Sequence, residues 1–172
     1  MFIVSAQVAQ RRAVSRRGAT VRTAGGLAAL TPYFLPVPYV VIALRPGPEL
    51  TVTEVLAWLG LALSVLGVAF SLWAIVALGR HYDLVLEVHQ DHELIRGGPY
   101  GLVRHPVYTG LALHFAGLCL ATGNLLLVLG TLLVSYPAFY LRARAEESLL
   151  RERFGAQYEE YAREVPMLVP LP

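Results

Sequence analysis

Charged residues are missing from three long stretches of the chain, and these stretches predict the elements that cross a membrane. No Asp, Glu, Lys or Arg occurs within residues 24–44, 55–79 or 105–141. A helix needs about 20 residues to cross the hydrocarbon of a bilayer, so each of the first two stretches can form one span. The third is too long for one span, and its turn-forming triplet at 122–124 indicates a tight hairpin of two short helices. The pattern therefore predicts an all-α, multi-pass membrane bundle of about four spans, near 24–44, 55–78, 106–122 and 125–141.

The segments around these spans divide the chain into three parts. A basic arm over 1–23 precedes the two N-terminal spans within 24–79, and residues 80–172 contain a polar loop, the hairpin and a C-terminal region. Beyond the last span we expect a charged amphipathic helix over 142–154 that ends at Phe154-Gly155, and then a short helix over 156–163.

Composition and charge add an orientation to this topology. The chain is 56% hydrophobic with a mean hydropathy of +0.55, which is too apolar for an ordinary soluble domain. All fourteen cationic residues are arginines, and a four-span topology places thirteen of them on one side and only Arg45 on the other. The positive-inside rule therefore predicts that both termini and the loop 80–104 are cytoplasmic. An all-arginine composition favours a prokaryotic plasma membrane. No basic patch interleaved with aromatic residues points to nucleic acid.

The stretch GGPYGLVRHPVYTG, residues 97–110, places turn-forming and polar residues at the edge of an apolar span. Pro106 suits the first position of a helix, where its missing N–H costs nothing. That helix N-terminus would present N–H groups at the cytoplasmic interface, which is a natural site for a carboxylate or another anion. The alternative is a membrane-entry turn whose tyrosines anchor it among the headgroups.

Arg142 and Glu146 stand four residues apart where the last span leaves the bilayer. On a helix they share a face, so they form either part of an interfacial pocket or an ordinary surface ion pair. Arg144 and Glu147 point in other directions and are expected to be solvated.

Two further features carry weaker signals. Tyr158 and Tyr161 lie one helical turn apart and either wall a pocket or anchor a helix at the headgroups. His89 and His92 lie in the polar loop, but a metal site needs three or four converging ligands. We therefore expect no metal.

The order of these motifs is more specific than any one of them. His92-Glu-Leu-Ile95 is followed by Gly98-Pro-Tyr100, Arg104-His-Pro-Val-Tyr108-Thr-Gly110, Arg142-x-x-x-Glu146-Glu147 and Phe154-Gly155-x-x-Tyr158-x-x-Tyr161. Over about residues 80–170 the chain resembles the isoprenylcysteine carboxyl methyltransferase family and its relatives among membrane phospholipid methyltransferases. The resemblance implies an integral membrane enzyme that uses S-adenosyl-L-methionine in a pocket at the cytoplasmic face.

The resemblance also implies roles for individual residues. The implied cofactor contacts are Gln90, His92, Leu94, Ile95, Tyr100, His105, Pro106, Tyr108 and Glu146. Arg142 falls where the family places an arginine near the reacting carboxylate of the substrate, and with Glu146 and His105 it makes up the implied catalytic set. Position 107 is Val where some relatives have Ser.

The implied partners are the lipid bilayer and a lipid-like or small apolar methyl acceptor. The family name suggests a prenylated cysteine carboxylate, and a carboxylate with a pKa of about 4 needs no general base at neutral pH. A phospholipid amine would arrive protonated and need a base, for which His105 or Glu146 would serve, whereas a thiol would have to become a thiolate near Arg142. An NADPH-dependent membrane reductase of similar fold and a non-catalytic membrane protein stay open as other classes.

Overall fold

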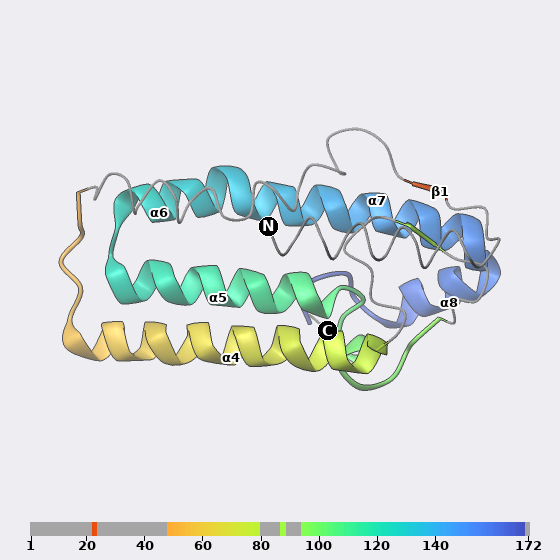
Figure 1. Cartoon of the computed structure of the whole chain (residues 1–172), viewed down its shortest axis with the longest axis horizontal. Helices are drawn as coiled ribbons and strands as arrows, with labels where there is room; N and C mark the ends of the chain where they lie inside the picture. Colours follow the sequence, from red (N-terminus) through yellow and green to blue (C-terminus); the bar gives the residue numbers. More distant parts are fainter. Residues whose placement is uncertain (1–21, 24–47, 80–86, 89–93, 171–172) are drawn as a thin grey trace, which may run out of the picture.

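The computed structural model describes residues 22–23, 48–79, 87–88 and 94–170, and apolar helices account for most of them. α4 (Glu54–Leu78), α5 (Pro106–Thr122) and a continuous helix over Leu125–Phe154 lie side by side, with α5 between the other two (Figure 1). α4 and the Leu125–Phe154 helix are each long and apolar enough to cross a membrane, while α5 is a shorter apolar helix. Most of the described residues are therefore helical, which confirms the predicted all-α class for this part of the chain.

Two parts of the predicted topology are not settled by these helices. The expected span at 24–44 and nearly all of the arm 1–23 lie outside the described residues, so the count of four spans stays a prediction. One short antiparallel pair, between β1 (Arg22–Thr23) and β2 (Glu87–Val88), was not predicted. A pair of two-residue strands has no recognisable periodicity in sequence.

α4 and α5 pack closely because small residues face each other along their whole contact. A Cβ atom on Gly67 would lie 2.5 Å from the carbonyl oxygen of Gly110, and one on Gly60 would lie 2.6 Å from that of Gly117. Such backbone proximity is typical of helices that pack within membranes. His114 joins this contact through a 2.8 Å hydrogen bond between its Nδ1 and the Ser64 hydroxyl.

The turn between α5 and α6 (Leu125–Gly130) has the form expected from the triplet at 122–124. Gly123 has a φ of 63°, and a Cβ there would lie 2.5 Å from the carbonyl oxygen of Leu50. The Asn124 side chain then caps α6 by accepting a hydrogen bond of 3.0 Å from Leu127 N–H. The predicted helical hairpin is thus confirmed.

The second arm of the hairpin contains a wider turn that the sequence did not predict. α6 continues through a single π-helical turn, η3 (Thr131–Ser135), into α7 (Tyr136–Phe154). The turn ends two residues before Pro137, which has no N–H to donate and whose ring crowds the preceding turn. Beyond it α7 runs to Phe154 as predicted, and Gly155, with a φ of 51°, leads into α8 (Ala156–Glu164).

Candidate functional site

The start of α5 and the charged half of α7 bring together three of the residues expected at the site. The hydroxyl of Tyr108 donates a hydrogen bond to Oε1 of Glu146. Arg142 Nε donates to the Tyr108 hydroxyl at 2.8 Å and to Glu146 Oε1 at 3.2 Å. Arg142 and Glu146 therefore share a helix face as predicted, and Tyr108 links that face to α5.

His105 precedes α5 and completes this polar cluster. Its Nδ1 lies 3.4 Å from Oε2 of Glu146, and its ring stacks on that of Tyr108 with 5.9 Å between centroids. Phe139 also stacks against Tyr108, with 6.1 Å between the ring centroids. The Tyr108 ring thus packs against two other aromatic rings, and its hydroxyl enters the polar cluster.

The charge on His105 is set by two opposing effects. Burial lowers the pKa of its imidazole, but contacts with the carboxylates of Glu146 and Glu147 outweigh burial and leave the pKa raised above 6.5. Oε1 of Glu147 lies 3.6 Å from Nε2 of His105, which is an ion-pair distance and too long for a hydrogen bond. His105 is therefore stabilised as a cation between two acidic side chains.

Glu147 is the important residue that the sequence interpretation placed wrongly. It was expected to be solvated, yet its side chain is only 1% exposed. Arg104 contacts its Oε1 through Nε at 2.8 Å and Nη2 at 2.5 Å, and Arg151 contacts its Oε2 at 3.1 Å. The spacing of four between Glu147 and Arg151 was a visible signal, but Arg104 lies in a distant segment. That spacing alone does not show that the carboxylate turns inward, because such pairs are also common on exposed helix faces.

A C-terminal segment, 165–168, crosses the start of α5. The N–H groups of Arg104 and His105 donate to the carbonyl oxygens of Pro166 and Met167 at 2.9 and 3.0 Å. The Thr109 hydroxyl donates to the carbonyl oxygen of Leu168 at 2.6 Å. The N–H groups of Arg104 and His105, which lie directly before α5, are therefore already bonded and are not available to an anion.

The N–H groups of Val107 and Tyr108 remain in the first helical turn. They precede the first intrahelical donor, Thr109, which donates to the carbonyl oxygen of His105 at 3.1 Å. Pro106 itself is buried at the first helical position, as predicted, and brings no N–H. At the start of α5, the N–H groups that could bind an anion are thus those of Val107 and Tyr108.

The other expected cofactor contacts lie in the segment before α5. Tyr100 is buried in η2 (Gly98–Gly101), and its carbonyl oxygen accepts a hydrogen bond of 2.6 Å from the Tyr161 hydroxyl. Leu94 and Ile95 are half-buried just before η2, and no described hydrogen bond or ring contact joins them to the His105 cluster. Gln90 and His92 lie outside the described residues, as does His89.

Tyr158 and Tyr161 anchor α8 against the protein. Both are buried, and the Arg96 guanidinium lies 5.6 Å from the centre of the Tyr161 ring. Burial raises the pKa of Tyr161 to about 12, so its hydroxyl stays neutral and keeps donating to η2. Of the two predicted roles, helix anchoring is the one these contacts support, with protein rather than headgroups as the partner.

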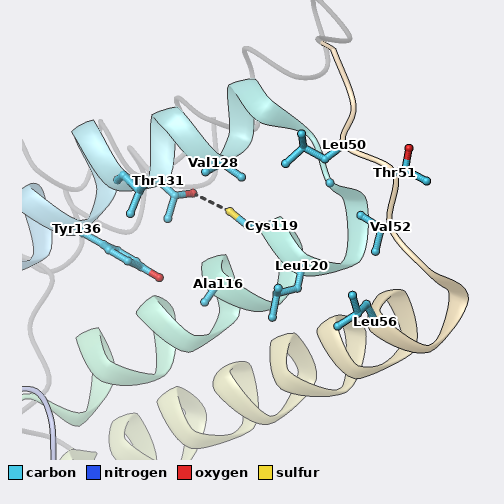
Figure 2. A pocket seen from close by; sticks show the side chains of 12 residues that line it. Leu50, Thr51, Val52, Leu56, Ala116, Cys119, Leu120, Val128, Thr131 and Tyr136 are labelled. Carbon is cyan, nitrogen blue, oxygen red and sulfur yellow. Dashed lines mark hydrogen bonds between the residues drawn. The ribbon is translucent and has the colours of Figure 1, made fainter.

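An apolar cavity of about 510 Å³ lies along the C-terminal half of α5, away from His105 (Figure 2). Side chains from the segment before α4, the first turn of α4, α5, α6, η3 and the start of α7 line it. Within its wall Cys119 Sγ donates to Thr131 Oγ1 at 3.5 Å. None of the expected site residues is among those that line it. The described part of the chain thus has a polar cluster and an apolar cavity at different positions along α5.

Comparison with known proteins gives concordant matches. A family model described as phospholipid methyltransferase matches residues 55–157. The chain is 34% identical over 125 residues to a probable protein-S-isoprenylcysteine O-methyltransferase of Oryza sativa subsp. indica, covering 72% of this chain and 65% of that protein. Protein-S-isoprenylcysteine O-methyltransferase B of Arabidopsis thaliana is 32% identical over 113 residues, covering 64% of this chain and 57% of that protein.

A solved structure matches the fold as well. The eukaryotic intramembrane Ras methyltransferase ICMT (isoprenylcysteine carboxyl methyltransferase) superposes with a TM-score of 0.63 at 28% identity, covering 84% of this chain and 51% of that one. The chain thus spans about half to two thirds of the length of these relatives. The matches confirm the resemblance carried by the motifs, and likeness to an intramembrane protein supports the predicted membrane location.

Proposed function

The chain belongs to the phospholipid methyltransferase family, and from this premise we propose that it transfers a methyl group from S-adenosyl-L-methionine to a lipid-like acceptor. The observation that carries the proposal is the contact of Arg142 and Glu146 with Tyr108, where α5 begins. The names of the relatives favour an isoprenylcysteine-type carboxylate as the acceptor.

The groups in the cluster fit the polar ends of this cofactor. Glu146 is 26% exposed, so its carboxylate is accessible to an ammonium group, and the N–H groups of Val107 and Tyr108 suit a carboxylate. The remaining proposed contacts come from the preceding loop and the start of α5: Gln90, His92, Leu94, Ile95, Tyr100, His105 and Pro106.

Arg142 is the proposed contact for the acceptor. Its Nε is fixed by Tyr108 and Glu146, which orients the guanidinium plane, and guanidinium groups bind carboxylates through parallel N–H donors. When bound, S-adenosyl-L-methionine would supply the methyl group, its sulfur–methyl bond breaking as the acceptor oxygen forms the C–O bond, and S-adenosylhomocysteine would be left. The role of the protein is to align the two molecules and to exclude water.

The surroundings of His105 argue against an amine acceptor that would use this residue as its base, which leaves Glu146 as the other candidate base. His105 is stabilised as a cation between Glu146 and Glu147, so it is poorly suited to take a proton from an ammonium group. A carboxylate acceptor needs no such base, because its ordinary pKa of about 4 leaves it ionised at neutral pH.

The proposal includes a membrane arrangement. Four spans would place both termini and the site in the cytoplasm of a prokaryotic plasma membrane, and the support for this is the distribution of the fourteen arginines. The site would then lie where α7 changes from apolar residues to the charged stretch that begins at Arg142.

Calorimetric binding of S-adenosylhomocysteine to the detergent-purified protein, with NADPH measured in parallel, tests the proposal. Micromolar binding of S-adenosylhomocysteine alone is the expected result. Binding of NADPH alone would replace the proposal with the membrane reductase class, and binding of neither would favour a non-catalytic membrane protein. A positive result would be followed by transfer assays with isoprenylated cysteine, phospholipid amine and thiol acceptors.

A further inference from the structure

Glu147 is a buried carboxylate held by three cationic side chains. Arg104 and Arg151 contact its two oxygens within 3.1 Å, and His105 Nε2 lies 3.6 Å from Oε1. Removing charged groups from water costs several kcal/mol per ion, and buried ion pairs often return no net stability compared with apolar residues of similar volume. Fold stability alone is therefore a weak explanation for this cluster.

Arg104 extends the influence of Glu147 to the C-terminal segment 165–168. While its Nε and Nη2 contact Glu147, its Nη1 donates to the carbonyl oxygens of Ala162 at 2.9 Å and Val165 at 2.5 Å. The same segment accepts hydrogen bonds from the N–H groups of Arg104 and His105. One carboxylate thus orients the guanidinium that ties 165–168 to the start of α5.

We propose that Glu147 is a positioning residue for the methyl-transfer site, holding His105 against Glu146 and holding segment 165–168 across the start of α5. The effect of Glu147 on methyl transfer rests on the proposed function. Its coupling to His105 does not, because that coupling follows from the distances between the two side chains. Glu147 acts through His105 and Arg104, since it is only 1% exposed and cannot reach a ligand. Glu146, its neighbour on α7, lies 3.4 Å from the other nitrogen of the same imidazole, Nδ1, and is itself 26% exposed.

Electrostatics support the coupling. Burial by itself would lower the pKa of His105, and contacts with Glu146 and Glu147 raise it instead. A nearby opposite charge shifts a pKa by about 1–3 units, so loss of either carboxylate should return His105 toward the neutral form.

The test is a titration of His105 by NMR on full-length, histidine-labelled protein in detergent micelles. His105→Gln assigns the signal among the five histidines. Glu147→Gln should lower the pKa of His105 by about one unit and weaken S-adenosylhomocysteine binding about tenfold. Glu152→Gln, the same change at an exposed position of α7, should match wild type in both measurements.

Either of two results would overturn the inference: an unchanged His105 titration in Glu147→Gln, or a lowered pKa with unchanged binding. If wild type does not bind S-adenosylhomocysteine, the proposed function fails, while the titration still decides whether Glu147 governs His105. If Glu147→Gln does not fold, Glu147→Asp decides, because it keeps the charge and withdraws it from Arg104 and His105. It should lower the pKa of His105 by less than Glu147→Gln does and weaken S-adenosylhomocysteine binding about fivefold or more, and wild-type binding would overturn the inference.

Discussion

The two ends of α5 are held by different kinds of contact. At His105, charged side chains and main-chain hydrogen bonds join α5 to α7 and to segment 165–168. At Thr122, close helix packing and a glycine turn hold the helix beside an apolar cavity. The polar end has charged groups and hydrogen-bond donors that can select a ligand by direction. The apolar end can select one mainly by size and shape.

This difference indicates where substitutions should affect chemistry and where they should affect only folding. Charge and hydrogen-bond geometry matter at the His105 end, because misplacing a donor by a fraction of an ångström changes what it binds. Volume matters at the other end, because the backbones already touch.

Arg142→Ala is expected to have the largest effect. Loss of the guanidinium removes the proposed acceptor contact, so turnover should fall by about 10²–10³-fold. Binding of S-adenosylhomocysteine should stay within about threefold of wild type, since the proposed cofactor contacts of Glu146 and of the Val107 and Tyr108 N–H groups are still present. Arg144→Ala, on an exposed position two residues away, is the matched control and should keep both properties. Normal turnover in Arg142→Ala would remove this residue from the site.

Glu146→Ala should affect cofactor binding instead. A hydrogen bond to a charged group is worth about 1.5–3 kcal/mol, so S-adenosylhomocysteine affinity should fall by roughly 10- to 100-fold by calorimetry. Glu152→Ala serves as the control on the same helix. Wild-type affinity in Glu146→Ala would show that the ammonium-binding group lies elsewhere.

Gly117→Ala addresses the apolar end. Its new Cβ would lie 2.4 Å from the backbone nitrogen of Ser64, so α4 and α5 must separate. Overpacking of this kind costs about 1–3 kcal/mol, and the melting temperature in detergent should drop while the folded protein binds S-adenosylhomocysteine normally. Gly97→Ala is the control, because nothing lies within 4 Å of the added atom. A melting temperature equal to that of wild type would contradict the close packing.

The smallest expected effect is a pH dependence of stability through His105. Burial opposes its charge, but Glu146 and Glu147 raise its pKa above 6.5. A raised pKa in the folded state adds stability below about pH 6.5, which is lost as the pH rises through the raised value. The stability difference between wild type and His105→Gln should therefore shrink as the pH is raised, measured by thermal unfolding across that range. A difference that grows with pH would show that the folded state prefers neutral His105.

The sequence predicted those features whose causes are local. Pro106 marks a helix start, Gly123-Asn124 marks the hairpin turn, and the spacing of Arg142 and Glu146 places them on one face. Each depends on residues within a few positions of one another. For the same reason the described helix boundaries agree closely with the expected ones.

The features that were missed depend on contacts between distant segments. Glu147 turns inward because Arg104, 43 residues earlier, meets it there. Segment 165–168 accepts hydrogen bonds from the N–H groups of Arg104 and His105, which lie about 60 residues earlier. The acceptors are main-chain carbonyl oxygens, which every residue has. Main-chain pairing of this kind has no signature in side-chain pattern, so these two hydrogen bonds could not be predicted.

The way segment 165–168 is held also makes it a place to attach a reporter. Its ties to Arg104 and His105 use the carbonyl oxygens of Pro166 and Met167, so the identity of the Met167 side chain is not needed to keep the segment in place. A Met167→Cys variant in a Cys119→Ser background would carry one labelling site, since Cys119 is the only cysteine of the chain. A fluorophore or spin label at that position would lie next to His105 and would register ligand arrival at the cluster in real time.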